Sequence, residues 1–272
     1  MATQHQSQAS DGATAQSGSM TAFIDRWIYV LMAVLFFATV LVGFVPDSLM
    51  KIELVRTGVR PPFPMILHVH AVLMGTWILL LLTQTGLMAT GRRAMHMQTG
   101  VAGMVLMPAI VLPGIVLVPT MYGQVYEQFN SAPPEAFTAL AERVNHVGNL
   151  ALLQFRAAIA FPLLVILALR ARRNRPDIHK RLMILATSVP LPAAIDRITW
   201  IPHTMPESSI SVPLYTFLWI APMFLWDLHR QRKVHPAYWI FLAVYLPLAL
   251  IGQLLWNTPF WLSTVPGLLG QG

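Results

Sequence analysis

Long apolar runs separated by short polar connections dominate the chain after residue 22. Several of them exceed the roughly 18 residues that indicate a membrane-spanning helix. Prolines fall inside most of these runs, as expected for helices that pack together and satisfy one another's backbone. The pattern predicts an all-α polytopic transmembrane helical bundle over residues 23–272. We expect seven spans, the sixth being short, near residues 27–45, 64–88, 98–118, 147–169, 181–201, 213–228 and 237–256.

Residues 1–22 differ from the rest of the chain because they are polar, small and low in complexity. They lack the basic start and the apolar stretch of a signal peptide. Such a composition cannot bury enough apolar surface to offset the entropy of ordering. We therefore expect a disordered cytoplasmic tail over residues 1–22.

The overall composition agrees with a membrane protein. Hydrophobic residues make up 56% of the chain and charged residues only 11%, whereas a soluble domain carries about 25% charged residues. We assign the net charge of +7 to cytoplasmic flanks that contact the anionic lipid of the bilayer, and not to a nucleic-acid partner. The absence of cysteine excludes disulfides and thiolate-bound metal centres. No pattern indicates an oligomeric state.

The basic residues are distributed unevenly between the predicted loops. The second, fourth and sixth loops hold eleven of the eighteen lysines and arginines, and the first, third and fifth hold four. Because basic loops stay in the cytoplasm, we expect a cytoplasmic N-terminus and an external C-terminus. We expect the chain to lie in the inner (cytoplasmic) membrane of a bacterium.

Histidines open four consecutive predicted helices on alternating sides of the membrane. His70 and His146 lie at the outer side, and His96 and His179 at the inner side. A six-coordinate haem needs one imidazole above and one below its ring, so each side supplies a candidate pair. His68 precedes His70 by two positions and points to nearly the opposite side of a helix, so at most one of them serves. The alternative is that these histidines are ordinary amphipathic residues at headgroup depth.

Arginines accompany the predicted inner pair. Arg92, Arg93 and Arg175 lie beside His96 and His179 in the sequence, and guanidinium groups bind carboxylates such as haem propionates in a bidentate way. Two hairpins repeat the order of outer histidine, apolar helix, arginine pair and inner histidine, a common plan of membrane proteins. Two further histidines, His229 and His235, follow the sixth span, and we assign them to a solvated basic loop.

These residues resemble a known family. The stretch His70-Ala-Val-Leu-Met74, the apolar helix after it, a basic turn and Met95-His96 are similar to the cytochrome b561 type. The resemblance covers residues 64–200 and implies two b-type haems, an outer one on His70 and His146 and an inner one on His96 and His179. It also implies electron transfer across the membrane from ascorbate or a quinol-like small reductant. The 50-residue gap before His146 and the seventh span depart from the family. The turn TGRRAMHMQTG also resembles uncharacterised bacterial inner-membrane proteins.

Charged residues inside the predicted spans indicate a second kind of site. Arg156 lies near the middle of the fourth span, and Asp196 and Arg197 lie in the outer third of the fifth. A charge at membrane depth costs about 3 kcal/mol on insertion scales and therefore faces the interior of a bundle, usually with a partner. We expect Arg156 and Asp196 to lie within two helical turns of each other, either as a structural ion pair or as part of a proton path.

Three functions follow from these observations. The first is electron transfer through two bis-histidine haems, and the sequence leaves open whether such a protein is itself an oxidoreductase. The second is a haem-free solute or proton transporter that uses Arg156 and Asp196. The third is a zinc or copper site formed by the outer histidines His70, His146 and His203, which needs three converging ligands.

Overall fold

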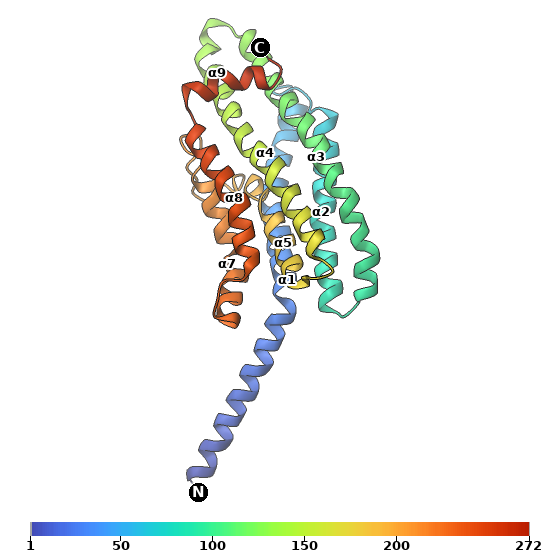
Figure 1. The fold of residues 1–272 in the computed structure, drawn as a ribbon. Coiled ribbons are helices and arrows are strands. Elements are labelled where there is room, and N and C mark those ends of the chain that lie inside the picture. Colours follow the sequence, from blue (N-terminus) through green and yellow to red (C-terminus); the bar gives the residue numbers. More distant parts are fainter. Residues whose placement is uncertain (1, 272) are drawn as a thin grey trace.

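The protein is an all-α, multi-span membrane protein (Figure 1). A computed structural model describes the backbone of residues 2–271 and the side chains of residues 19–271. The predicted tail, residues 1–22, lies for the most part outside these described side chains and stays a prediction. Within the described part, six helices are long and apolar enough to cross a membrane. They are α1 (Ala2–Arg56), α2 (Met65–Ala89), α3 (Arg93–Asn130), α4 (Phe137–Ala171), α7 (Ser211–Gln231) and α8 (Pro236–Leu255).

The third and fourth helices are longer than their apolar runs predict. Helix α3 has 38 residues and α4 has 35, and residues 131–133 and the short 3-10 turn η1 (Pro134–Ala136) lie between them. The polar segment between the predicted third and fourth spans, residues 119–146, is therefore mostly helical. Helix α3 runs through three internal prolines, Pro108, Pro113 and Pro119.

The predicted fifth span, residues 181–201, is wrong as a continuous helix. Helix α5 (Pro176–Ser188) has 13 residues, and a four-residue helix α6 (Pro192–Ile195) follows after a turn. Pro190 and Pro192 explain the break, because proline lacks the backbone N–H and its ring clashes with the preceding turn. Ser188 is fully buried at this point. Irregular backbone at membrane depth is tolerated where protein surrounds it.

Helices α2 to α5 form a closed four-helix group. Each packs against the next along the chain, and the circle is closed by a hydrogen bond of 3.1 Å from Trp77 Nε1 of α2 to Thr187 Oγ1 of α5. The ring of Trp77 meets Phe161 of α4 edge-on, with centroids 5.0 Å apart. Both side chains are buried. These aromatic rings therefore fill the centre of the group.

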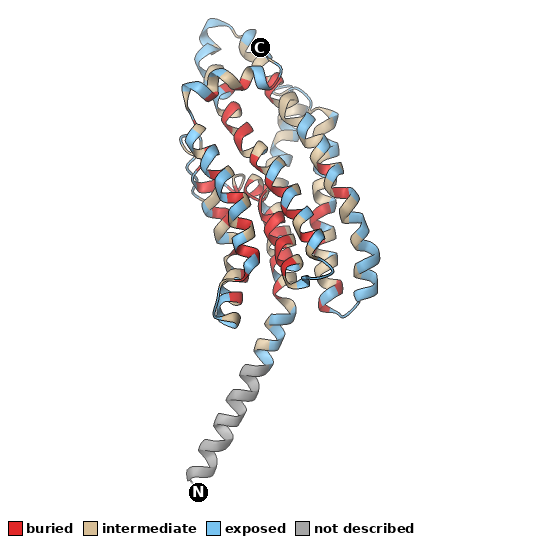
Figure 2. Ribbon diagram, viewed as in Figure 1, coloured by how far each residue is buried: buried red, intermediate tan, exposed pale blue. Residues whose placement is uncertain are grey.

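Helices α1, α7 and α8 enclose the broken helix from the other side. Trp219 of α7 donates a 2.8 Å hydrogen bond to Thr39 of α1. Gly43 of α1 touches α6 so closely that an added Cβ atom would lie 2.1 Å from the carbonyl oxygen of Ala194. Figure 2 shows the result, since α5 is buried over residues 181–188, apart from the partly buried Met183, while much of α3 is exposed.

The connections between helices gather at two ends of the bundle. The α2–α3, α4–α5 and α7–α8 connections lie at the end where α1 enters, and α9 (Pro259–Leu268) and the C-terminus lie at the other (Figure 1). The three connections carry the clusters of basic residues, so we call this the basic end and the opposite one the far end. This arrangement is compatible with the predicted orientation, and which end faces the cytoplasm stays a prediction.

Candidate functional site

The predicted inner histidines lie on helices that face each other diagonally in the four-helix group. His96 is in the first turns of α3, and His179 is in the first turn of α5. Both side chains are partly buried. A positive charge on His96 would lower the pKa of His179, so the two imidazoles are within electrostatic reach of each other.

Each of these rings has its Nδ1 atom held by the protein. His179 Nδ1 is 2.9 Å from the carbonyl oxygen of Ala168, which accepts its proton. His96 Nδ1 is 2.5 Å from the side-chain amide of Gln84, and in the orientation where this amide donates to Thr99 Oγ1 its oxygen accepts the Nδ1 proton. Turning the amide would instead present its NH₂ group to Nδ1 and to the carbonyl of His96. Only the first orientation leaves the Nε2 lone pair free for a metal.

Helix geometry places the inner pair at one depth. Trp77 and Thr187 are hydrogen-bonded and give a common level for α2 and α5. Gln84, which contacts His96, follows Trp77 by seven residues, or about 10 Å along the axis. His179 precedes Thr187 by eight residues, or about 12 Å in the same direction. The two rings therefore lie at similar levels near the basic end. Burial lowers the pKa of His179, which keeps its imidazole in the neutral, ligating form.

The predicted outer histidines do not share a depth. His70 precedes Trp77 by seven residues in α2, and His146 precedes Phe161 by fifteen residues in α4. Because Trp77 and Phe161 touch, His146 lies about 12 Å nearer the far end than His70 at a rise of about 1.5 Å per residue.

A second comparison along α3 agrees with this offset. His70 of α2 packs on Gly114 of α3, where its Cε1 atom lies 3.3 Å from the point that a Cβ atom on Gly114 would occupy. Near His146, the contact with α3 is instead made by Tyr122, which packs on Gly148 of α4. Gly114 and Tyr122 are eight residues apart, or about 12 Å. An outer haem held by both histidines would require α2 to slide along α4 by about that distance. His70 and not His68 faces the interior, because His68 is exposed and lies against Phe63.

The three arginines predicted to bind haem propionates differ in whether they already have an acidic partner. Arg92 and Arg93 are exposed, and Arg93 acts electrostatically on His96. Arg175 instead forms an ion pair of 3.1 Å with Asp177. The sequence interpretation did not assign Arg172, whose charge acts on His179. Its position in the arginine-rich turn after α4 could have indicated that Arg172 lies close to the inner histidines.

The predicted intramembrane charges do not form the expected direct contact. Arg156 is 5% exposed and its guanidinium lies over the ring of Tyr245, 5.1 Å from the centroid. Asp196, next to α6, acts on it electrostatically but makes no ion pair with it among the described residues. Arg156 Nε and Asp196 Oδ1 are buried without a hydrogen-bond partner in the described part of the chain. Arg197 pairs with Asp47 of α1 at 3.1 Å.

The basic end contains a buried polar network that the sequence interpretation missed. Arg181 of α5 donates two hydrogen bonds to Asp227 of α7, at 2.7 and 2.5 Å. Tyr238 of α8 donates a third, at 2.6 Å. The signal in the sequence was an acid inside an apolar run, in the stretch FLWDLHRQ. These contacts join three helices.

His235 belongs to the same region and corrects another expectation. It is 5% exposed, although its loop was predicted to be solvated, and it caps α8 by accepting from the backbone N–H of Ala237. Its Nε2 atom lies 3.1 Å from Asp177. The Arg175 guanidinium lowers the pKa of Asp177 to about 2, and burial lowers the pKa of His235. His229 stays exposed, as predicted for this loop.

The far end was predicted to hold a possible metal site on His70, His146 and His203. His203 is exposed and interacts with the carbonyl oxygen of Met205. Across the residues whose side chains are described, no three histidines, cysteines or acids converge in a group that could hold a metal ion. The polar contacts at this end are instead structural, such as Asn149 of α4 donating to Asn257 at 2.5 Å in the turn before α9.

Comparisons with known proteins do not identify a function for these residues. No protein-family model, no curated protein and no solved structure matches this chain.

Proposed function

We propose that the protein is a membrane cytochrome that holds one b-type haem between His96 and His179 and exchanges electrons at the basic end. The observation that carries the proposal is the inner pair itself. Two imidazoles on diagonally opposed helices lie at similar depth. His179 has its Nδ1 proton held by Ala168, which leaves Nε2 available, and His96 has the same arrangement when the oxygen of the Gln84 amide faces its Nδ1 atom. A bound haem would supply one-electron redox chemistry. The proposal keeps the inner half of the predicted two-haem arrangement.

The chain's own residues prepare this site. Ala168 and Gln84 fix the orientation of the two rings, as the partners behind metal-bound histidines generally do. Trp77 and Phe161 fill the bundle toward its centre and limit the access of water from that direction. Arg93 and Arg172 supply positive charge near the rings, which suits the carboxylates that a haem carries.

Optical spectra of the purified protein test the proposal. Protein from haem-sufficient cells should show the reduced-minus-oxidised bands of low-spin b haem, with one haem per chain by pyridine haemochrome assay. His96→Ala and His179→Ala should each abolish these bands, because one axial ligand does not hold a six-coordinate haem. His146→Ala is the matched control and should retain the full haem content.

Two results would contradict the proposal. One is a wild-type protein without haem. The other is a loss of haem in His146→Ala as large as in His96→Ala. A content of two haems per chain would instead restore the two-haem arrangement and require the helix shift described above.

A second function is favoured by a separate observation, the broken helix beside two buried charged residues, Arg156 and Asp196, each with a buried polar atom that has no hydrogen-bond partner in the described part of the chain. Discontinuous helices with freed backbone groups line the substrate sites of many transporters. Arg156 and Asp196 lie near such a break, so we propose proton or anion movement through this region as the alternative. In haem-free vesicles, Arg156→Met and Asp196→Asn should each abolish the flux, whereas Arg56→Met, at the exposed end of α1, should not. Absence of flux in the wild type would refute it.

A further inference from the structure

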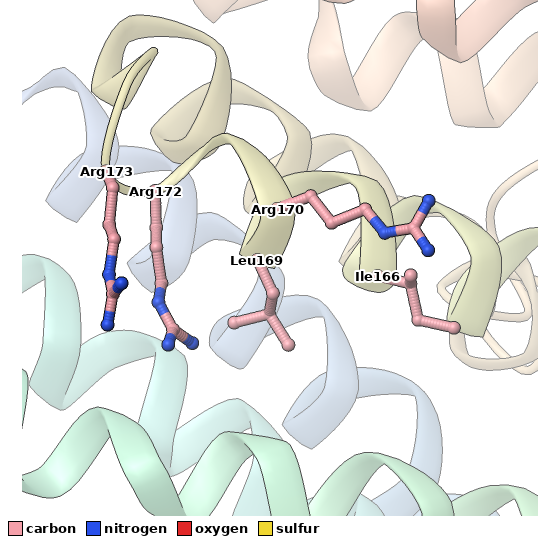
Figure 3. Close-up of a pocket in the computed structure, with 5 residues that line it drawn as sticks. All are labelled: Ile166, Leu169, Arg170, Arg172 and Arg173. Carbon is pink, nitrogen blue, oxygen red and sulfur yellow. The ribbon is translucent and has the colours of Figure 1, made fainter.

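A groove with three arginines lies at the basic end on the surface of α4. It has a volume of about 410 Å³ and is lined by Ile166, Leu169, Arg170, Arg172 and Arg173. Figure 3 shows Arg172 and Arg173 extending side by side in the same direction as Leu169, whereas Arg170 extends along the helix with its guanidinium next to Ile166. The lining therefore combines two apolar side chains with three arginines, which we call the rim of the groove.

These guanidinium groups have no acidic partner. Among the described side chains, no carboxylate forms an ion pair with Arg170, Arg172 or Arg173, and the Arg172 guanidinium donates to Met104 Sδ at 3.2 Å. The nearest acid along the chain, Asp177, pairs with Arg175 and His235. The rim thus carries uncompensated positive charge, which calls for an anion from outside the chain.

An exposed apolar stripe on α4 leads into this groove. Ile159, Leu163 and Ile166 are 51%, 40% and 39% exposed, and their spacing of four and three residues puts them on one helix face. Arg170, four residues later, continues the same face toward the basic end. A ligand that covers both the stripe and the groove therefore has an apolar part about 10 Å long, the length of the stripe, and an anionic group at the end that meets the arginines.

We propose that this groove binds the headgroup of an anionic phospholipid, with an acyl chain along the α4 stripe. Phosphate oxygens accept bidentate hydrogen bonds from guanidinium groups, and basic pockets between membrane helices are a known way to hold such headgroups. Because the chain is a membrane protein, phospholipids are present all around it. Arg172 lies both in this groove and near the His179 ring. The test below therefore changes only Arg170 and Arg173, which have no part in the proposed haem site.

Native mass spectrometry of delipidated protein in detergent tests the proposal. Phosphatidylglycerol and phosphatidylcholine with identical acyl chains are titrated separately, and the wild type should prefer phosphatidylglycerol. The double variant Arg170→Gln and Arg173→Gln should weaken phosphatidylglycerol binding by about 25-fold, because each arginine near an anionic headgroup contributes about fivefold. Phosphatidylcholine binding should not change.

Matched variants separate this site from a general attraction to basic surface. Replacing the same two arginines with lysine keeps the charge and should retain most of the preference. Arg232→Gln removes an exposed charge in the α7–α8 connection and should leave it unchanged. If the double variant does not fold, Arg173→Gln alone should show a loss of about fivefold. No preference in the wild type, an unchanged double variant, or an equal loss in Arg232→Gln would overturn the proposal.

Discussion

The buried ion pair at the basic end allows the most direct test of the packing. The Arg181 and Asp227 side chains are 9% and 7% exposed, and Asp227 also accepts from Tyr238. Replacing Asp227 with asparagine keeps the shape and removes the charge. Breaking a buried pair by neutralising one partner costs about 3–5 kcal/mol, because the other charge stays buried without compensation. We therefore expect the Asp227→Asn protein to be less stable by about 4 kcal/mol.

Thermal unfolding in detergent measures this loss. The chain has eight tryptophans and no cysteine, so intrinsic fluorescence is the natural signal. A change of about 4 kcal/mol corresponds to a fall in Tm of about 8–16 °C for a domain of this size. Glu53→Gln, in the exposed pair of Glu53 and Arg56, is the control and should cost less than about 1 kcal/mol.

A double substitution distinguishes two causes of the lost stability, the uncompensated buried charge and the lost packing. Arg181→Met with Asp227→Leu removes both charges, and such replacements are often neutral or stabilising. It should therefore recover most of the stability that Asp227→Asn loses. An Asp227→Asn protein within about 1 kcal/mol of the wild type would refute the reasoning. A double variant as unstable as the single one would place the cost in lost packing and not in the buried charge.

Three further predictions concern backbone packing, pH and a helix end. Gly43→Ala should destabilise by about 1–3 kcal/mol or more, because its Cβ would meet the carbonyl oxygen of Ala194, whereas Gly75→Ala, with open space around it, should be neutral or slightly stabilising in the same unfolding assay. Burial lowers the pKa of His235 below its unfolded value of about 6.5. The contribution of the neutral His235 to the free energy of unfolding is therefore complete above about pH 6.5 and declines as the pH falls. If His235→Gln showed the same pH dependence of Tm between pH 7 and 5 as the wild type, this reasoning would be wrong. Arg232 ends α7 with φ of 54°, and Arg232→Gly should raise the free energy of unfolding by about 1 kcal/mol; a lower Tm would argue against strain there.

The candidate site was only partly predictable. The sequence placed a histidine near the basic end of both α3 and α5 and identified the basic connections beside them. It did not indicate that Arg175 pairs with Asp177, that Arg172 lies near His179, or that His235 is buried. These features depend on which side chains meet across helices, and hydropathy along one chain does not encode those contacts.

The sequence by itself determined the helical class, most of the spans and the basic end. Those properties are local, because the apolar length of each segment and the charges of its flanks decide whether it enters a bilayer. Only the tertiary structure decided that the fifth helix stops at Ser188 and that α2 and α4 are offset by about 12 Å. The offset is set by how side chains such as Trp77 and Phe161 pack between helices. Sliding one helix along another leaves its own sequence pattern unchanged, so spacing alone could not show that only the inner histidines share a depth.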